Sequence, residues 1–350
     1  MIAVDAMGGD FAPDVTVMGA INAARQGVAV TLFGDEERLK ELLYDCDPGW
    51  QHLPLFIEHC SETVAMHDEP SRAILQKKDS SLVRAMNAVM EGRAQAFVSA
   101  GNSGAVLVAA TLTIGRVPGV LRPAIGNFLP KKRGEIFCMD LGANTDCRPE
   151  YLEQFAHMAH VYVQMNKQIS SPKIALLSNG AEPYKGASAV KEAYKLLQMS
   201  QLNFAGNIES RDIFDTDIDI VICDGFVGNV LLKGIQGTAK LIMHWLQEEA
   251  MQSWWSRFYF ALGRRFFYSL KARMDYAKYG GALLLGVNAP VIIAHGSSSV
   301  VAIEQAIMRA DENIKSRFTQ LYNAALQEQF ALSQPMRMQT SNYLVGRAEE

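Results

Sequence analysis

The segment GNSGA at residues 101–105 places a hydroxyl and an amide between two glycines, directly after an apolar run. It is close to the G-x-S-x-G nucleophile elbow, in which Ser103 would attack and the later Asp224 and His295 would complete the triad of an acyl hydrolase or transacylase. Alternatively, the turn binds an anion through backbone N–H groups at the start of a helix. The anion-binding interpretation accounts for Asn102 and both glycines, whereas the hydrolase interpretation accounts only for the serine.

Other polar side chains stand at similar places in the sequence. Lys185 lies in NGAEPYKGAS, where it either holds an anion as a compact charge or is a solvated residue at a helix start. Asp5, Asp140 and Asp224 each end an apolar run, and an aspartate there either caps the next turn or takes part in a site. His295 in IIAHGSSS is either a structural histidine or a reacting group.

These turns belong to a regular alternation of short apolar runs and longer helical patterns. The alternation predicts an α/β fold with a mostly parallel, doubly wound sheet in three αβα layers. In such a sheet the carboxyl ends of the strands share one edge, where ligands bind. A phosphate or acyl-oxygen site is therefore expected at the turns 99–104, 140–144, 178–186, 224–229 and 295–299.

Composition narrows the class of protein. The 350 residues carry a formal net charge of -4, which argues against nucleic-acid binding, and the five cysteines contain no C-x-x-C pair. P-loop, G-x-G-x-x-G and H-E-x-x-H motifs are absent, so we expect no metal and no cofactor. No apolar run approaches the length of a membrane span, and the first residues have no pattern of a signal peptide, which predicts a cytoplasmic protein.

The segment SWWSRFYFALGRRFFYSL at residues 253–270 is unusual because it is rich in aromatic rings and arginines and has no acid. Aromatic rings flanked by cations are typical of a membrane surface, and a dimer contact is the alternative. A scaffold role without catalysis would use this segment but would leave the polar turns unexplained. The candidate membrane-contacting residues are Trp254, Trp255, Arg257, Phe258 and Arg264.

We expect one α/β catalytic domain over residues 1–330. It includes amphipathic helices at 245–278, which contact the membrane or a second copy. Residues 331–350 are expected to form a loose tail.

Several blocks, in order from about residue 2 to residue 325, together resemble the bacterial phosphate acyltransferases of phospholipid synthesis, the PlsX family. These blocks are IAVDAMGGDFAP, DEPSRAILQKKDSS, VSAGNSGA, DLGANTDCRPEYLEQFA, CDGFVGNVLLK and YGGALLLGVNAPVIIAHGSS. Ser103 stands where the family commonly has threonine, which keeps the hydroxyl. Lys185 is kept in GAEPYKG, although two acids of the corresponding family block are replaced.

The resemblance implies transfer of a long-chain acyl group from acyl–acyl carrier protein to inorganic phosphate, giving acyl phosphate. It also implies a fold similar to phosphotransacetylases and isocitrate dehydrogenases, and a homodimer. The protein would act peripherally at the inner face of the cytoplasmic membrane. There an integral-membrane acyltransferase would use the product to acylate glycerol 3-phosphate.

With this resemblance, roles can be assigned as hypotheses. The phosphate-binding candidates are Asn102, Ser103, Gly104 and Lys185. Asn229 is assigned to polarising the carbonyl, and Asp224 and His295 to orienting neighbours or returning a proton to the leaving thiolate. Supporting positions at strand ends are Asp5, Gly8, Gly9, Asp140, Asn144, Gly225 and Gly228.

Overall fold

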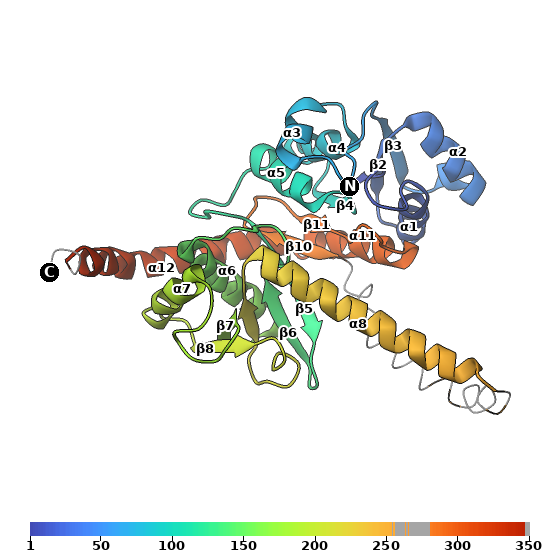
Figure 1. Ribbon diagram of the computed structural model, residues 1–350. Coiled ribbons are helices and arrows are strands. Elements are labelled where there is room, and N and C mark those ends of the chain that lie inside the picture. The colour runs from blue at the N-terminus through green and yellow to red at the C-terminus, as the bar shows by residue number, and fades with distance from the viewer. Residues whose placement is uncertain (254, 256–262, 264, 266–280, 347–350) are drawn as a thin grey trace.

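One mixed sheet forms the centre of the molecule (Figure 1). The computed structural model describes residues 1–253, 255, 263, 265 and 281–346. The strands within them are β1 (Ile2–Asp5), β2 (Val30–Gly34), β3 (Leu55–His59), β4 (Ala96–Ser99), β5 (Ala124–Pro130), β6 (Glu135–Met139), β7 (Ile174–Ser178), β8 (Phe204–Glu209), β9 (Ile220–Ile222), β10 (Ala282–Leu285) and β11 (Val291–Ile293). Their order across the sheet is β3-β2-β1-β4-β11-β10-β5-β6-β9-β7-β8.

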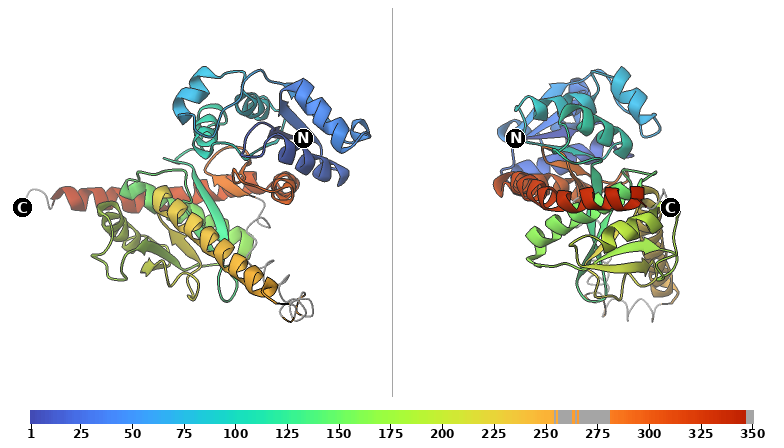
Figure 2. Two further views of the ribbon diagram at one scale, coloured as in Figure 1. Left: turned by 45° about the vertical axis from the view of Figure 1, so that its right-hand side comes forward. Right: turned by 90° about the vertical axis from the view of Figure 1, so that its left-hand side faces the viewer.

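Helices cover both faces of this sheet, as the two further views show (Figure 2). One face packs against α1 (Asp14–Arg25), α2 (Glu36–Cys46), α6 (Pro149–Lys167), α7 (Ser188–Gln198), α11 (Val300–Lys315) and α12 (Phe318–Gly346). The other packs against α3 (Pro70–Gln76), α4 (Ser81–Met90), α5 (Ser103–Thr113) and the start of α8 (Gly225–Met251). Each face has its own hydrophobic core, which gives the predicted three-layer α/β architecture.

The strands form two parallel groups that run in opposite directions. β1 to β4 and β11 form one group, and β6 to β9 form the other. Between them, β10 and β5 pair antiparallel with their neighbours. The prediction that all five polar turns follow strands of one direction was therefore wrong. Apolar runs reveal where strands are, but the direction of a strand is decided by its pairing, which the runs do not encode.

A stagger between the two groups nevertheless brings their carboxyl ends together. Ile293 at the end of β11 is opposite Ala282. Met139 at the end of β6 is opposite Gly126, which pairs with Leu283, the next residue along β10. The two sets of strand ends therefore differ in level by about one residue, roughly 3.3 Å. Turns from both groups thus open toward the middle of the molecule.

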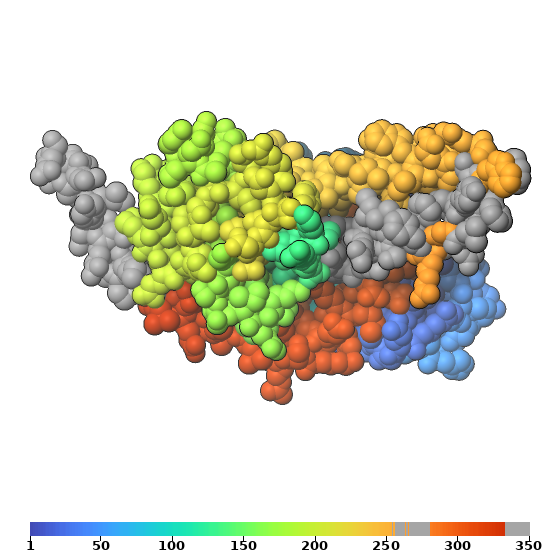
Figure 3. Space-filling model, turned by 90° about the horizontal axis from the view of Figure 1, so that it is seen from below, coloured from blue at the N-terminus to red at the C-terminus, as the bar shows by residue number. Residues whose placement is uncertain are grey.

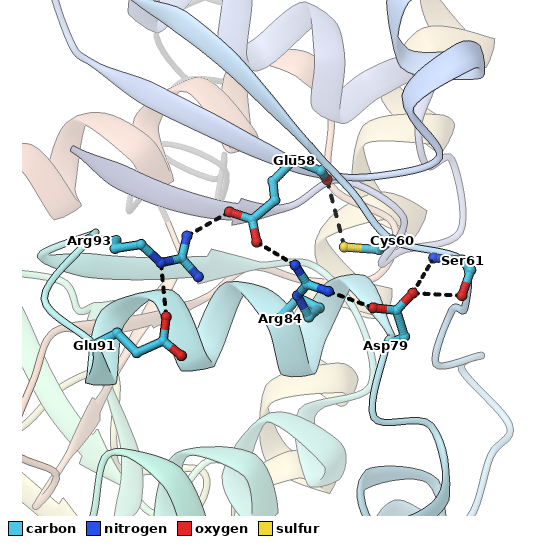
Figure 4. Close-up of polar contacts among 7 residues, drawn as sticks. All are labelled: Glu58, Cys60, Ser61, Asp79, Arg84, Glu91 and Arg93. Carbon is cyan, nitrogen blue, oxygen red and sulfur yellow. Dashed lines mark hydrogen bonds and ion pairs between the residues drawn. The ribbon is translucent and has the colours of Figure 1, made fainter.

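The edge strand β3 is tied to α4 by a network of ion pairs (Figure 4). Glu58 accepts hydrogen bonds from Arg84 at 2.9 Å and from Arg93 at 2.6 Å. Arg84 also donates to Asp79 at 2.7 Å. The hydrogen bonds that Ser61 and Arg84 donate lower the pKa of Asp79 to about 2. None of these side chains lines the cavity described below, so the network serves the fold.

Two long helices extend away from the body of the molecule (Figure 1). α12 continues to Gly346, into the segment for which a loose tail was expected, because its Gln, Ala, Leu and Met residues favour helix. Residues 245–251 of the expected insertion form the end of α8. Among the candidate membrane-contacting residues, only Trp255 is described, and its side chain is exposed. The other four candidates, Trp254, Arg257, Phe258 and Arg264, lie outside the described residues.

Candidate active site

A cavity of about 1200 Å³ lies where the carboxyl ends of the two strand groups meet. Ser103 and His295 line it from the first group, and Gly142 and Asn229 line it from the second. One face of α8 forms a long wall. The structure therefore brings four of the five predicted turns to one cavity. Turn 178–186 contributes no residue to its described lining.

Ser103 faces this cavity from the first turn of α5, and Asn102 fixes the turn that presents it. The Asn102 side-chain oxygen accepts a hydrogen bond from the Ala105 N–H at 3.1 Å, which caps the helix. Its amide nitrogen donates to the carbonyl oxygens of Met66 at 3.2 Å and Asp68 at 3.0 Å. Both ends of the Asn102 side chain are thus engaged with backbone, which makes it a positioning residue.

Glycines allow two loops to touch behind Ser103. A Cβ atom at Gly8 would lie 2.4 Å from the Asp5 carboxylate and 2.9 Å from the Gly101 Cα atom. Gly9 has a φ of +124°, in a region that favours glycine. Gly104 packs beside proline: a Cβ there would lie 2.8 Å from a ring carbon. The glycines therefore hold the turn of the serine in place.

Asp5 is a buried acceptor that joins β1 to its neighbours. Its carboxylate accepts hydrogen bonds from the hydroxyls of Ser81 at 2.6 Å and Ser99 at 2.8 Å. Ser99 in turn accepts from the Gly101 N–H at 2.9 Å. Burial raises the pKa of Asp5, while these hydrogen bonds lower it. Asp5 does not line the cavity, so it supports the turn and does not contact a ligand there.

Asp140 has the corresponding place after β6, with different partners. One carboxylate oxygen accepts from the N–H groups of Ile125 at 3.1 Å, Gly142 at 3.1 Å and Ala143 at 3.0 Å. The other accepts from the Asn144 N–H at 2.7 Å and from its side-chain amide at 2.9 Å. Burial raises the pKa of Asp140 and the hydrogen bonds oppose this shift. The group organises the whole turn.

The start of α8 packs tightly onto this turn. Asp224 caps the helix by accepting a backbone hydrogen bond of 2.8 Å. The Gly225 N–H donates to the Asn144 carbonyl at 2.7 Å. Gly228 leaves no room for a side chain, because a Cβ there would lie 1.8 Å from the Asp140 carbonyl oxygen. The spacing of these glycines therefore reflects close packing, and it directs Asn229 into the cavity.

His295 uses its Nδ1 atom to contact its own loop, and no hydrogen bond to a described residue engages its Nε2 atom. Its Nδ1 atom accepts a hydrogen bond from the Ser297 N–H at 3.2 Å and lies 2.9 Å from the Ser297 hydroxyl oxygen. Burial lowers the pKa of His295; Lys233 and Lys240 lower it further, and Asp10 opposes them. Because a backbone N–H can only donate, Nδ1 must be unprotonated, so the neutral ring carries its proton on Nε2.

Six charged residues of the cavity were not singled out from the sequence: Asp10, Lys131, Lys132, Asp215, Lys233 and Lys240. Lys233 follows Asn229 by one helical turn, a spacing that could have revealed it, and Asp10 directly follows two glycines. Lys132 is paired with Asp215, whereas neither Lys233 nor Lys240 forms an ion pair within the part of the chain that the structure describes. Lys185, in contrast, is absent from the described lining, and its Nζ lies 5.6 Å from the centre of the neighbouring Tyr184 ring.

The arrangement does not match a serine hydrolase triad. Asp224 is engaged as a helix cap, and His295 is oriented by Ser297. Among the described residues, no carboxylate forms a hydrogen bond with the His295 ring, so the third member of the triad is missing there. Residues 1–253 and 281–346 also contain no cluster of His, Cys, Asp or Glu suited to a metal ion.

Comparison with known proteins shows which family the chain resembles. The family described as "Fatty acid synthesis protein" matches residues 1–321. A "Phosphate acyltransferase" of Pelobacter propionicus is 47% identical over 89% of this chain and 90% of its own length. Another, from Geotalea daltonii, is 43% identical over 99% of both chains. Among solved structures, a phosphotransacetylase from Streptococcus pyogenes covers 90% of this chain and 94% of its own, with a TM-score of 0.57 and 18% identity.

The solved structure shows a shared fold and, at this identity, no more than that. The relatives share far more sequence, over nearly the whole length of both chains, and they are acyltransferases by name. The resemblance found in the sequence is confirmed: the chain belongs to the fatty acid synthesis protein family, among relatives named phosphate acyltransferase, and has the phosphotransacetylase-like α/β fold.

Proposed function

We propose that the protein transfers a long-chain acyl group from acyl–acyl carrier protein to inorganic phosphate, giving acyl phosphate for phosphatidic acid synthesis. The observation that carries the proposal is one cavity that joins a helix N-terminus, unpaired lysines and an apolar wall. An anion and an alkyl chain are the two parts of the product. The names of the relatives support acyl transfer to phosphate.

Phosphate is placed at the first turn of α5, against the Ser103 hydroxyl and the N–H of Gly104. Helix N-termini attract anions through unpaired N–H groups and the helix dipole. The sequence suggested Lys185 as the cation for this phosphate. We propose Lys233 for this role, because it lines the cavity and carries a charge that no described residue neutralises.

The reaction needs no covalent enzyme intermediate. A phosphate oxygen attacks the thioester carbonyl carbon, a C–O bond forms, the C–S bond breaks, and the leaving thiolate takes up a proton. The Nε2–H of neutral His295 and the amide of Asn229 are our candidates to stabilise the oxyanion of the tetrahedral intermediate. Exclusion of water protects the acyl phosphate from hydrolysis.

The proposal extends to the partners of the reaction. We propose a homodimer that binds the acidic acyl carrier protein and docks peripherally on the cytoplasmic membrane, where an integral-membrane acyltransferase takes the product to glycerol 3-phosphate. None of the described helices is long and apolar enough to cross a bilayer. The aromatic and basic residues of 253–270 support contact with an anionic surface.

The decisive experiment incubates the protein with palmitoyl–acyl carrier protein, with and without inorganic phosphate, and measures thiol release and acyl phosphate. We expect release only with phosphate, and without added metal or nucleotide. Free fatty acid formed at full rate without phosphate would overturn the proposal and favour the hydrolase that uses Ser103.

A further inference from the structure

The cavity face of α8 is divided lengthwise into two stripes. At 3.6 residues per turn, the apolar and polar lining residues occupy adjacent arcs of about 80° each. The apolar stripe consists of Leu232, Ile235, Ala239 and Met243. The polar stripe consists of Asn229, Lys233, Gln236, Lys240, His244 and Gln247. Such segregation suits an amphiphilic ligand that lies along the helix.

The two ends of the apolar stripe differ in what they contact. Leu232 and Ile235 pack against the core that includes Ile125 and Ile293, at the strand ends. Ala239 and Met243 line the cavity but belong to neither hydrophobic core, because α8 has there left the sheet. Seen from below, the helix forms an exposed ridge along one side of the molecule (Figure 3).

The stripe has the length of a fatty chain. From Leu232 to Met243 the helix advances about 17 Å at roughly 1.5 Å per residue. An extended alkyl chain advances about 1.3 Å per carbon, so this length matches about 13 carbons. The polar stripe runs beside the apolar stripe along the same stretch of α8. Its member Lys233 interacts electrostatically with His295.

We propose that the acyl chain lies against the apolar stripe of α8, with its thioester carbonyl, and after transfer its phosphate, on the side of Lys233, and that Ala239 determines which chain lengths are accepted. Ala239 is the smallest member of the stripe, and it stands midway between Ile235 and Met243. A larger side chain there would obstruct the cavity about 10 Å beyond Leu232, after about eight carbons. The inference rests on the proposed function for the identity of the chain.

The test measures binding of n-alkylphosphonates of 6 to 16 carbons to the full-length protein by calorimetry, below their micelle concentrations. We expect wild-type affinity to rise about fourfold per methylene until about 13 carbons, because each newly buried methylene adds to the hydrophobic gain. In Ala239→Phe the rise should stop at about eight carbons, while shorter phosphonates bind as in wild type. Ala239→Leu, a milder change, should show an intermediate limit.

The matched control is Thr238→Phe. Thr238 is exposed and follows Gln236 by two positions, so it points away from the cavity. This variant should keep the wild-type profile. A wild-type affinity independent of chain length, an unchanged limit in both Ala239 variants, or the same truncation in Thr238→Phe would overturn the proposal. Since binding needs no turnover, these outcomes are independent of whether phosphate supports thioester cleavage.

Discussion

Each parallel group of strands has a buried aspartate at the end of one strand, Asp5 at the end of β1 and Asp140 after β6. The two aspartates differ in their hydrogen-bond partners. Asp5 at the end of β1 accepts from the hydroxyls of Ser81 and Ser99, beside backbone N–H groups of Met7 and Gly8. Asp140 after β6 is held by N–H groups on both oxygens, five in all. A hydroxyl can reverse its role from donor to acceptor, whereas an N–H group cannot. Replacement of the carboxylate by an amide should therefore be tolerated better at Asp5 than at Asp140.

The group of strands that contains β1, β4 and β11 contributes Ser103 and His295 to the lining of the cavity. The other group contributes Asn229 and, one turn along α8, Lys233. The aspartates thus build the turns, and the residues that follow them line the cavity. Four predictions test this division, beginning with the largest effect.

Asp140→Asn should destabilise the protein by at least about 3 kcal/mol, because an amide in either orientation turns its NH₂ toward buried N–H donors and each lost partner costs roughly 1–3 kcal/mol. Asp5→Asn should cost less, about 1–2 kcal/mol, since its NH₂ can donate to the Ser81 hydroxyl while its carbonyl oxygen still accepts from Ser99. Urea denaturation followed by circular dichroism measures both. Equal losses in the two variants would refute the distinction between the two turns.

Lys233→Ala should raise the phosphate concentration needed for half-maximal thiol release by about tenfold or more, since a hydrogen bond to a charged group contributes roughly 1.5–3 kcal/mol. Lys185→Ala should change it about twofold at most, because Lys185 does not line the cavity. Steady-state kinetics with varied phosphate decides between the lysines. The reverse result would return the phosphate to the turn 178–186.

Ser103→Ala should lower kcat/KM by up to about tenfold and leave measurable turnover, because a neutral hydrogen bond contributes about 0.5–1.5 kcal/mol. Asn102→Ala should instead lower the unfolding free energy by about 1 kcal/mol through loss of the helix cap. A loss of several thousandfold in Ser103→Ala, or an acyl adduct on Ser103 found by mass spectrometry, would identify the serine as the nucleophile.

The smallest effect concerns pH. Because the folded pKa of His295 is lowered, the unfolded chain binds a proton more readily, and the unfolding free energy falls as the pH drops from about 6.5 through the folded pKa. His295→Gln should show a weaker decline between pH 7.5 and 5. The remaining decline includes His160, whose pKa burial also lowers. Denaturation at several pH values checks this, and parallel curves would show that His295 does not contribute.

Some of the site residues predicted from the sequence line one cavity, and others do not. Ser103, Asn229 and His295 were expected at one crevice and do line one cavity. Asp5, Asp140 and Asp224 were expected to cap turns or act in the site, and their hydrogen bonds place them in the turns. Lys233 was missed although it follows Asn229 by one helical turn, because that spacing was not combined with the position of Asn229 at the polar turn.

The sequence by itself determined the elements and the positions of the polar turns, because apolar runs and glycines act through local geometry. It also determined the family, since its motifs extend over nearly the whole chain. Only the tertiary structure decided the reversal of strand direction through β5 and β10, and the stagger that nevertheless unites the turns. It alone selected which side of α8 faces the cavity, since strand pairing and helix packing depend on contacts between residues far apart in the chain.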